Sequence, residues 1–254
     1  MVMLESELRG KVVSTMQCWV GWSEGNGRFK EIIDTYNSME TLPRAYPVKY
    51  TDEWCAATVT AAGIVNGCTR IIHPECGVEE MARLYEAEGR LYGRDYKPTP
   101  GDIVFYSWAC NGWGDHVGIV ESVGGDMMTV LEGNKGKAVG QRYISTSWQY
   151  IRGYGVPDYK HEAARQSIKA LADISVINSP DYWIKAVEGD TVPGLCELFG
   201  AAADNIKKAG PRLLDTWEAA EKLGAAGILP GDLGGWLEQS RIVGTLLQAL
   251  GGCV

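Results

Sequence analysis

The stretch that decides the fold runs from Tyr50 to Gly63 and reads YTDEWCAATVTAAG. The Ala- and Gly-rich residues after Cys55 let neighbouring backbone pack closely against this segment. Asp52 is a residue type that caps helix N-termini, and Asn66-Gly67 is typical of a helix end. We therefore predict a helix that begins near Asp52, ends at Asn66-Gly67 and carries Cys55 in its first turn.

Cys55 would then occupy a position suited to a nucleophile. The unpaired amides and the positive end of the helix dipole stabilise a thiolate there. Asp52 and Glu53 oppose thiolate formation, so the activation requires a cationic partner, for which a histidine is the natural candidate. The chain has three histidines, and His116, within GDHVGIVE at 114–121, stands at the head of a predicted strand. These two residues form a candidate Cys–His pair.

The first 159 residues alternate helical and strand-like segments. A short amphipathic helix is predicted at Lys30–Tyr36. Four strand candidates follow the Cys55 helix, each bounded by Gly or Asn turn signals: Ile103–Ser107, His116–Ser122, Met127–Glu132 and Val139–Tyr143. Helices followed by an antiparallel sheet define an α+β fold.

The predicted hairpin between the second and third of these strands brings polar residues to His116. Cross-strand partners share a face, so pairing Ser122 with Asp126 places His116 opposite Glu132. Asn134, two residues further on, points to the same face if the strand stays extended. A carboxylate or amide beside the imidazole would fix its tautomer and support its positive charge.

These segments together resemble the CHAP amidase/endopeptidases of the NlpC/P60 superclan, which are papain-like cysteine hydrolases of bacterial peptidoglycan. The likeness covers residues 15–159 and rests on WCA at 54–56, PGDIVFY at 100–106, DHVGIV at 115–120 and EGN at 132–134. It implies an antiparallel sheet in a papain-like domain. Carried over by position, it makes Cys55 the nucleophile, His116 its base, and Glu132 and Asn134 the polar residues that orient the histidine or flank the site.

The resemblance implies hydrolysis of a peptidoglycan amide bond, either between muramic acid and L-alanine or within the peptide. Trp54 and Trp113 flank the site and are candidates for substrate binding, although core packing is an equal alternative for each. The acidic calcium loop of some CHAP members is not evident before Cys55. Cys68, His73 and Cys76 lack a fourth zinc ligand. We therefore expect no metal and no other cofactor.

Composition excludes several other classes of protein. The 254 residues carry a formal net charge of −8, which argues against a nucleic-acid partner because such proteins present a basic face to phosphates. No apolar run approaches the roughly 20 residues of a membrane span. The seven cysteines form no CxxC pair and are expected to be free thiols. The N-terminus lacks a secretory signal pattern, so we expect the protein in the cytoplasm until lysis and then at the cell wall, as for phage or prophage endolysins.

The composition changes near Pro157–Lys160, where strand candidates give way to Ala- and Leu-rich helical periodicity. We predict a hydrolase domain at residues 1–159 and a small all-α domain at residues 160–254. A weak duplication relates Lys169–Ile184 to Lys222–Leu237, with two unrelated helical hairpins as the alternative. The second domain is expected to bind a wall polymer or to mediate self-association into a homo-oligomer.

Two other functions fit parts of the sequence. A secreted effector or toxin amidase would use the same Cys55 and His116 on another target. A non-catalytic wall-binding protein with the same fold would not need the complete set of Cys55, His116, Glu132 and Asn134. The intact set favours an enzyme.

Overall fold

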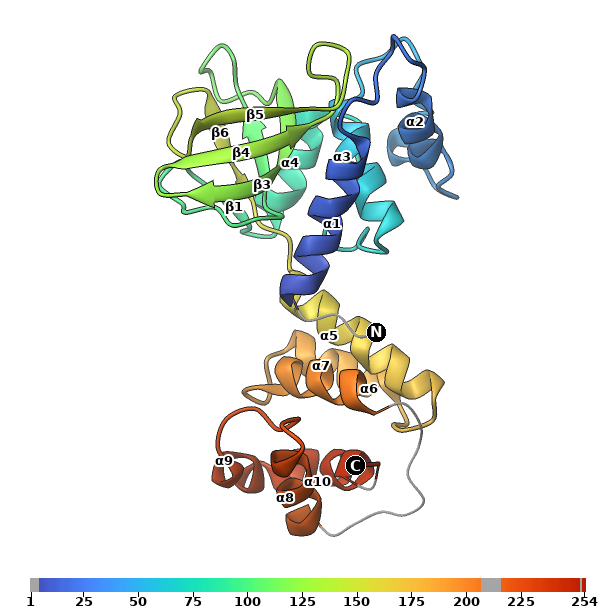
Figure 1. Cartoon of the computed structure of the whole chain (residues 1–254), viewed down its shortest axis with the longest axis vertical. Coiled ribbons are helices and arrows are strands. Elements are labelled where there is room, and N and C mark those ends of the chain that lie inside the picture. Colours follow the sequence, from blue (N-terminus) through green and yellow to red (C-terminus); the bar gives the residue numbers. More distant parts are fainter. Residues whose placement is uncertain (1–4, 207–215, 252) are drawn as a thin grey trace. The chain divides into compact units, whose positions relative to one another are not determined.

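The structure is a computed structural model that describes residues 5–206, 216–251 and 253–254. Two compact units divide the chain (Figure 1): residues 9–158 form one, and residues 159–254 with the start of the first helix form the other. Among the described helices, none combines the length and the apolar character needed to cross a membrane.

The first unit has helices before strands, which confirms the predicted α+β class. Its helical segments are α1 (Glu5–Trp19), α2 (Phe29–Asn37), the 3-10 turn η1 (Pro43–Ala45), α3 (Cys55–Val65) and α4 (Val78–Ala87). The strands are β1 (Leu91–Tyr92), β2 (Ile103–Tyr106), β3 (His116–Gly124), β4 (Met127–Glu132), β5 (Gly140–Ser145) and β6 (Ile151–Gly155). They form one antiparallel sheet in the order β1-β6-β2-β3-β4-β5 (Figure 1).

One face of this sheet forms its own core because the sheet is strongly curved. The Tyr154 hydroxyl on β6 lies 3.6 Å from the Met128 sulfur on β4, although β2 and β3 run between these strands. The side chains buried together on this face are Val104, Tyr106, Val120, Met128, Val130, Ile144, Ile151 and Tyr154. The opposite face meets α4, where Tyr85 packs against Phe105 with ring centroids 6.1 Å apart.

Helix α3 is buried around its whole circumference. Every residue from Cys55 to Gly63 is buried, and all are small or β-branched. At Gly63 a β-carbon would lie 3.0 Å from the side chain of Ile72, so the absence of a side chain permits close packing. The helix ends before Gly67, whose φ of +64° is left-handed as expected for a helix terminator.

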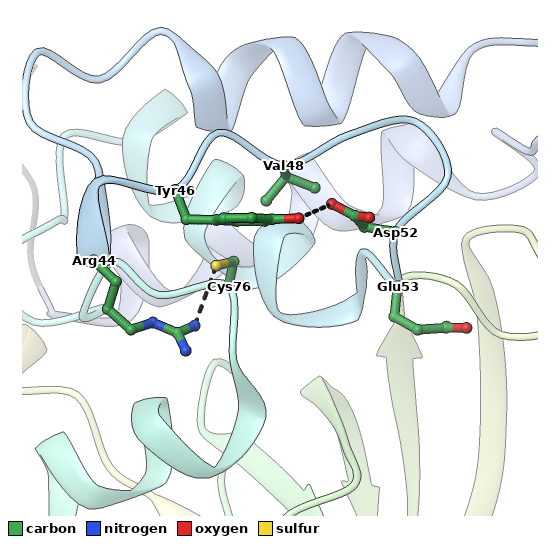
Figure 2. A pocket seen from close by; sticks show the side chains of 6 residues that line it. All are labelled: Arg44, Tyr46, Val48, Asp52, Glu53 and Cys76. Atoms are coloured by element: carbon green, nitrogen blue, oxygen red, sulfur yellow. Dashed lines mark hydrogen bonds between the residues drawn. The ribbon is translucent and has the colours of Figure 1, made fainter.

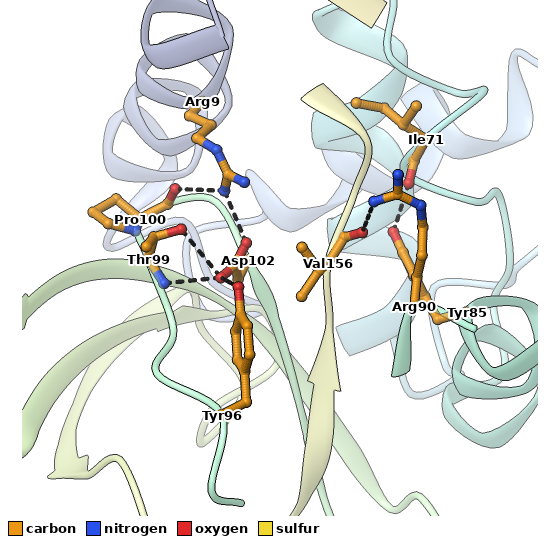
Figure 3. Close-up of polar contacts among 9 residues, drawn as sticks. All are labelled: Arg9, Ile71, Tyr85, Arg90, Tyr96, Thr99, Pro100, Asp102 and Val156. Carbon is orange, nitrogen blue, oxygen red and sulfur yellow. Dashed lines mark hydrogen bonds and ion pairs between the residues drawn. The ribbon is translucent and has the colours of Figure 1, made fainter. Parts of the chain in front are cut away.

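A buried carboxylate in the Pro100-Gly101-Asp102 motif fixes the position at which β2 begins. Asp102 accepts hydrogen bonds from Arg9 at 2.8 Å, the Tyr96 hydroxyl at 3.0 Å and the Thr99 amide at 2.8 Å (Figure 3). Its side chain is fully buried, so these partners replace the water that the charge gives up. The motif therefore fixes the start of the strand that lies beside His116.

The structure corrects two details predicted for this unit. Asp52 does not cap α3, because its carboxylate accepts from the Lys49 amide and the Tyr46 hydroxyl, and Trp54 occupies the capping position. Ser122 pairs with Thr129 rather than with Asp126, since a bulge between Val120 and Ser122 shifts the register. The strands β1 and β6 were not predicted.

The second unit is entirely helical where it is described. Its helices are α5 (Tyr159–Asp173), α6 (Pro180–Glu188), α7 (Leu195–Asn205), α8 (Thr216–Ala225), α9 (Leu233–Glu238) and α10 (Ser240–Gly251). Helix α5 packs against α6 and α7, and α8 packs against α9 and α10. Trp183 on α6 and Trp236 on α9 are both buried in this core.

The ends of α5 and α8 have the same geometry. Ser175 and Gly227 both follow their helix with a left-handed backbone, at φ of +59° and +69°. The next residue then donates its amide to the carbonyl of Leu171 after α5 and of Leu223 after α8, each at 2.9 Å. Helices α3 and α4 end in the same way at Gly67 and Gly89, so this common helix ending is compatible both with a duplication and with two helical hairpins.

Candidate active site

Cys55 is the first residue of α3, as the sequence predicted. The residue is 6% exposed, and the first turn of this fully described helix holds no acidic residue. The first N–H groups of a helix have no partner within the helix, and they carry the positive end of its dipole. The start of α3 therefore places unpaired N–H groups and a positive partial charge beside Cys55.

His116 opens β3 and contacts the end of β4. Its Nε2 lies 3.1 Å from Oε2 of Glu132, whose side chain is fully buried. Because Nε2 is engaged with this carboxylate, Nδ1 is the ring nitrogen left for Cys55. The buried carboxylate thus fixes the tautomer of the imidazole and stabilises its protonated form.

The contact between His116 and Glu132 depends on a glycine. Ile119 pairs with Leu131, and continuing this register puts Gly118, not His116, directly opposite Glu132. His116 is two residues further along the same face of β3, so the Glu132 side chain reaches it diagonally. A β-carbon at position 118 would lie 2.8 Å from Cγ of Glu132. Gly118 leaves the space through which the carboxylate passes.

The Gly118→Ala variant is expected to lose about 1–3 kcal/mol of stability, because the added methyl group overpacks the sheet. It should also lose activity, because Glu132 must move away from His116. Gly124→Ala, on the same strand, is the matched control, since a β-carbon at that position would meet nothing within 4 Å. Thermal unfolding and wall-clearing rates would check both effects, and equal behaviour of the two variants would contradict them.

Arg142 holds the other side of Glu132. From β5 it donates through Nε to Oε1 at 2.6 Å and through a terminal nitrogen to Oε2 at 2.9 Å. Such a two-pronged contact fixes both the position and the charge of a carboxylate. The guanidinium also lies 5.3 Å from the ring centroid of Trp108 and 5.6 Å from that of Tyr106. The sequence analysis did not identify Arg142, because only the pairing of β4 with β5 brings it to Glu132.

The protonation states follow from these contacts. Burial lowers the pKa of His116, but hydrogen bonding and charge interaction with Cys55 and Glu132 outweigh it and raise the pKa to about 9. Burial raises the pKa of Glu132, but the hydrogen bonds from His116 and Arg142 hold it below its ordinary value. At neutral pH the site therefore holds a protonated imidazole between Cys55 and a carboxylate.

Aromatic rings cover His116. Tyr106, its direct partner on β2, and Trp108 both stack near the imidazole, with ring centroids 5.8 and 5.9 Å away. Trp108 is 39% exposed, and its amide donates to Asp115 at 2.7 Å. Asp115 thus holds the loop that carries Trp108. The Trp108 ring in turn presents an exposed apolar surface next to His116.

The other predicted site residues lie in three different settings. Trp113 is 51% exposed and can meet a ligand. Trp54 is fully buried against Phe29, with ring centroids 5.6 Å apart, so the expectation that it binds substrate is corrected to a packing role. Asn134 has a left-handed backbone at φ +56° and donates to Glu53 instead of continuing the strand towards His116. Glu53 was not singled out as a site residue from the sequence.

The residues considered for zinc make separate contacts. His73 lies 3.1 Å from Glu88, Cys68 contacts the Asn66 carbonyl, and Cys76 contacts Arg44. Within the described residues, no group of three or more His, Cys, Asp and Glu side chains is placed to hold a metal ion.

Comparison with known proteins gives one family match. Residues 45–134 match the CHAP domain family, a range that contains Cys55, His116, Glu132 and Asn134. No curated protein is significantly similar to the chain. The crystal structure of Ly7917 is similar at 19% identity over 51% of this chain and 62% of that chain, with a TM-score of 0.33. The matched region spans 62% of Ly7917, less than two thirds of that chain. The family match thus places a CHAP domain at residues 45–134 of this chain.

Proposed function

We propose that this protein hydrolyses an amide bond of bacterial peptidoglycan, with Cys55 as nucleophile and His116 as general base and acid. The CHAP domain supports the substrate class. The contact between His116 and the buried Glu132 is the observation that carries the proposed mechanism. It gives the imidazole a fixed tautomer and a raised pKa next to a cysteine at a helix start.

The proposed reaction has two halves. In the first, His116 already holds the proton of the Cys55–His116 pair, and the thiolate of Cys55 attacks the carbonyl carbon of the scissile amide. His116 then gives that proton to the amide nitrogen, the C–N bond breaks, and the amine leaves behind a thioester on Cys55. In the second, His116 takes a proton from water, the hydroxide attacks the thioester, and the carboxylic acid leaves as the C–S bond breaks, which restores the Cys55 thiolate beside the protonated His116.

The backbone supplies stabilisation for the oxyanion formed in each half. The Cys55 amide is at the start of α3, where N–H groups have no partner within the helix. An oxyanion on the attacked carbon would lie close to that amide, as such transition states require.

Wall hydrolysis by the purified full-length protein tests this proposal. The wild type is expected to clear a suspension of Gram-positive walls, and mass spectrometry of the fragments identifies the new terminus as that of an amidase or an endopeptidase. Cys55→Ser should leave the walls turbid, while Cys110→Ser, which changes an exposed cysteine, should clear them at the wild-type rate. An active Cys55→Ser variant, or an inert wild type, would refute the proposal.

We also propose that the protein acts as an endolysin, held in the cytoplasm until the membrane is breached. The combination of a CHAP domain with a small helical unit supports this role. Production inside a Gram-positive host should be harmless until a membrane-permeabilising agent is added, and lysis should then follow. Lysis without that agent would contradict the proposed route.

The helical unit is proposed to bind a wall polymer. A pocket of about 500 Å³ is lined by α6, the turn before it and α10, and Tyr182 at its edge is 54% exposed. Polar groups in the lining, including Asn178, Ser179 and Thr245, suit a hydroxyl-rich ligand.

Tyr182→Ala is therefore expected to weaken binding to purified walls by at least about fivefold, because exposed aromatic side chains carry much of such contacts. Trp217→Ala is the control, since Trp217 is 57% exposed and lies outside this pocket. Co-sedimentation with walls measures both variants. Equal binding by the two would contradict the assignment, and a dimeric mass in solution together with that result would favour self-association.

A further inference from the structure

A pocket beside the nucleophile has no role in the mechanism above. It has a volume of about 370 Å³ and is lined by Arg44, Tyr46, Val48, Asp52, Glu53 and Cys76 (Figure 2). All but Cys76 come from the segment between α2 and α3, which includes the 3-10 turn η1. The pocket is large enough to hold an amino-acid side chain with its charged group.

Opposite charges lie at separate ends of this pocket. Figure 2 shows Arg44 on one side, Asp52 and Glu53 on the other, and the Tyr46 ring between them. The guanidinium of Arg44 is already paired with Glu75 at 2.7 Å and donates to the Cys76 sulfur at 3.3 Å. The charge of Arg44 is thus largely balanced before any ligand enters.

The carboxylates at the other end of the pocket accept hydrogen bonds from uncharged groups. Asp52 accepts from the Tyr46 hydroxyl and the Lys49 amide, both at 2.8 Å, and these bonds hold its pKa below the ordinary value. Glu53 accepts from the side-chain amide of Asn134. The nearby Lys137 forms an ion pair with Glu24 at 2.9 Å. Lys49 and Lys137 also act on Asp52 and Glu53 by charge, but neither lysine lines the pocket. The lining at this end thus holds two carboxylates, and a cation that enters would be attracted to both.

The carboxylate end is also the end near the reacting thiol. Glu53 precedes Cys55 by two residues, so their Cα atoms are at most about 7.6 Å apart. Tyr46 is 40% exposed, and its ring adds a surface over which a cationic group is favourably placed. A ligand bound here would lie next to the bond that Cys55 attacks.

We propose that this pocket is a substrate subsite for a primary ammonium group, carried by a diamino acid in the peptide of peptidoglycan. Asp52 and Glu53 bind the ammonium group, and the Tyr46 ring packs against the alkyl chain that bears it. The subsite rests on the proposed function, and it makes the peptide part of the wall, rather than the glycan, the element that positions the scissile bond.

Binding of two matched peptides tests the subsite without turnover. The probes are Nα-acetyl-L-Ala–D-isoglutamyl–L-Lys and the same peptide with its lysine Nε also acetylated, titrated by calorimetry at pH 7 into the full-length Cys55→Ala protein. The free amine is expected to bind at least about tenfold more tightly, as hydrogen bonds to charged groups allow. Adding Glu53→Gln or Asp52→Asn should reduce this ratio towards one, because each keeps the shape and an acceptor oxygen but removes a charge. Glu40→Gln changes an exposed carboxylate outside the pocket and should preserve the ratio.

Each result decides one of the two proposals. Equal affinity for the two peptides, no binding of either, or a ratio that survives both pocket substitutions would overturn the subsite. If the wild type clears walls and shows no preference for the amine, the subsite fails and the hydrolase stands. A preference for the amine in a protein that never clears walls would instead refute the hydrolase.

Discussion

Wall clearing by the His116→Ala variant is expected to fall by at least about a thousandfold, because one imidazole both activates the thiol and protonates the leaving amine. The fold should survive, since His116 lies at the start of β3 and its ring is covered by Tyr106 and Trp108 on the outer side of the site. Initial rates of wall clearing, with circular dichroism as a check of folding, measure this effect.

His73→Ala is the matched control. That histidine packs against Tyr85, with ring centroids 4.7 Å apart, and pairs with Glu88. The His73→Ala variant should clear walls at the wild-type rate, or at a rate reduced only as far as a small loss of stability explains. A His116→Ala protein that is folded and retains more than a tenth of the activity would show that another group serves as base.

The second large effect is expected for Glu132→Gln, and it has a pH signature. The hydrogen bond to Glu132 and the negative charge of this carboxylate both help to raise the pKa of His116 to about 9. Removing the charge lowers that pKa, so the alkaline limb of kcat/KM, which follows loss of the imidazolium, should move from near pH 9 to lower pH. The pH profile of a soluble peptide substrate measures the shift. An unchanged alkaline limb would contradict the assigned coupling.

The same substitution should destabilise the fold. Glutamine at position 132 keeps an acceptor oxygen but leaves the Arg142 guanidinium without its counter-charge, and breaking a buried ion pair costs about 3–5 kcal/mol. Because Arg142 is partly exposed, the lower end of that range is expected. Glu121→Gln on β3 is the control, since its carboxylate bonds the exposed side chains of Gln17 and Gln141.

The sign of the pH dependence of stability follows from both groups. His116, whose pKa is raised, contributes stability that is complete below its unfolded value of 6.5 and is lost as pH rises through about 9. Glu132, whose pKa is lowered, contributes stability that is present above its unfolded value of 4.5 and is lost as pH falls through the folded value. The contribution of this pair is therefore largest between about pH 4.5 and 6.5, and Glu132→Gln should remove that maximum.

The nucleophile helix and the central strands could be predicted because their signals are local. Small residues after Cys55 indicate a closely packed helix, and glycines mark both ends of the hairpin that holds His116 and Glu132. Strand β6 was missed because Gly153 and Gly155 suggest a turn. A β-carbon at these positions would lie 2.6 Å from the Tyr92 carbonyl and 2.9 Å from Tyr85, so close packing explains both glycines.

The register of the hairpin could not be predicted from its turn alone. A bulge between Val120 and Ser122 adds a residue to β3, and nothing in the sequence marks it. His116 and Glu132 were nevertheless matched, because the diagonal across Gly118 joins them on one face. Arg142 was missed for a related reason: its role appears only when Val130 pairs with Arg142 across β4 and β5.

Selective alkylation tests the activation of Cys55 by His116 most directly. The full-length protein is treated with less than one equivalent of iodoacetamide at pH 6, and the labelled peptides are identified by mass spectrometry. An ordinary thiol is well under about 1% ionised at this pH, so exposure alone would favour Cys18 and Cys110, which are exposed. Cys55 is expected to react first although the residue is only 6% exposed, and His116→Ala should abolish this preference. Labelling of Cys18 or Cys110 before Cys55 in the wild type would contradict this expectation.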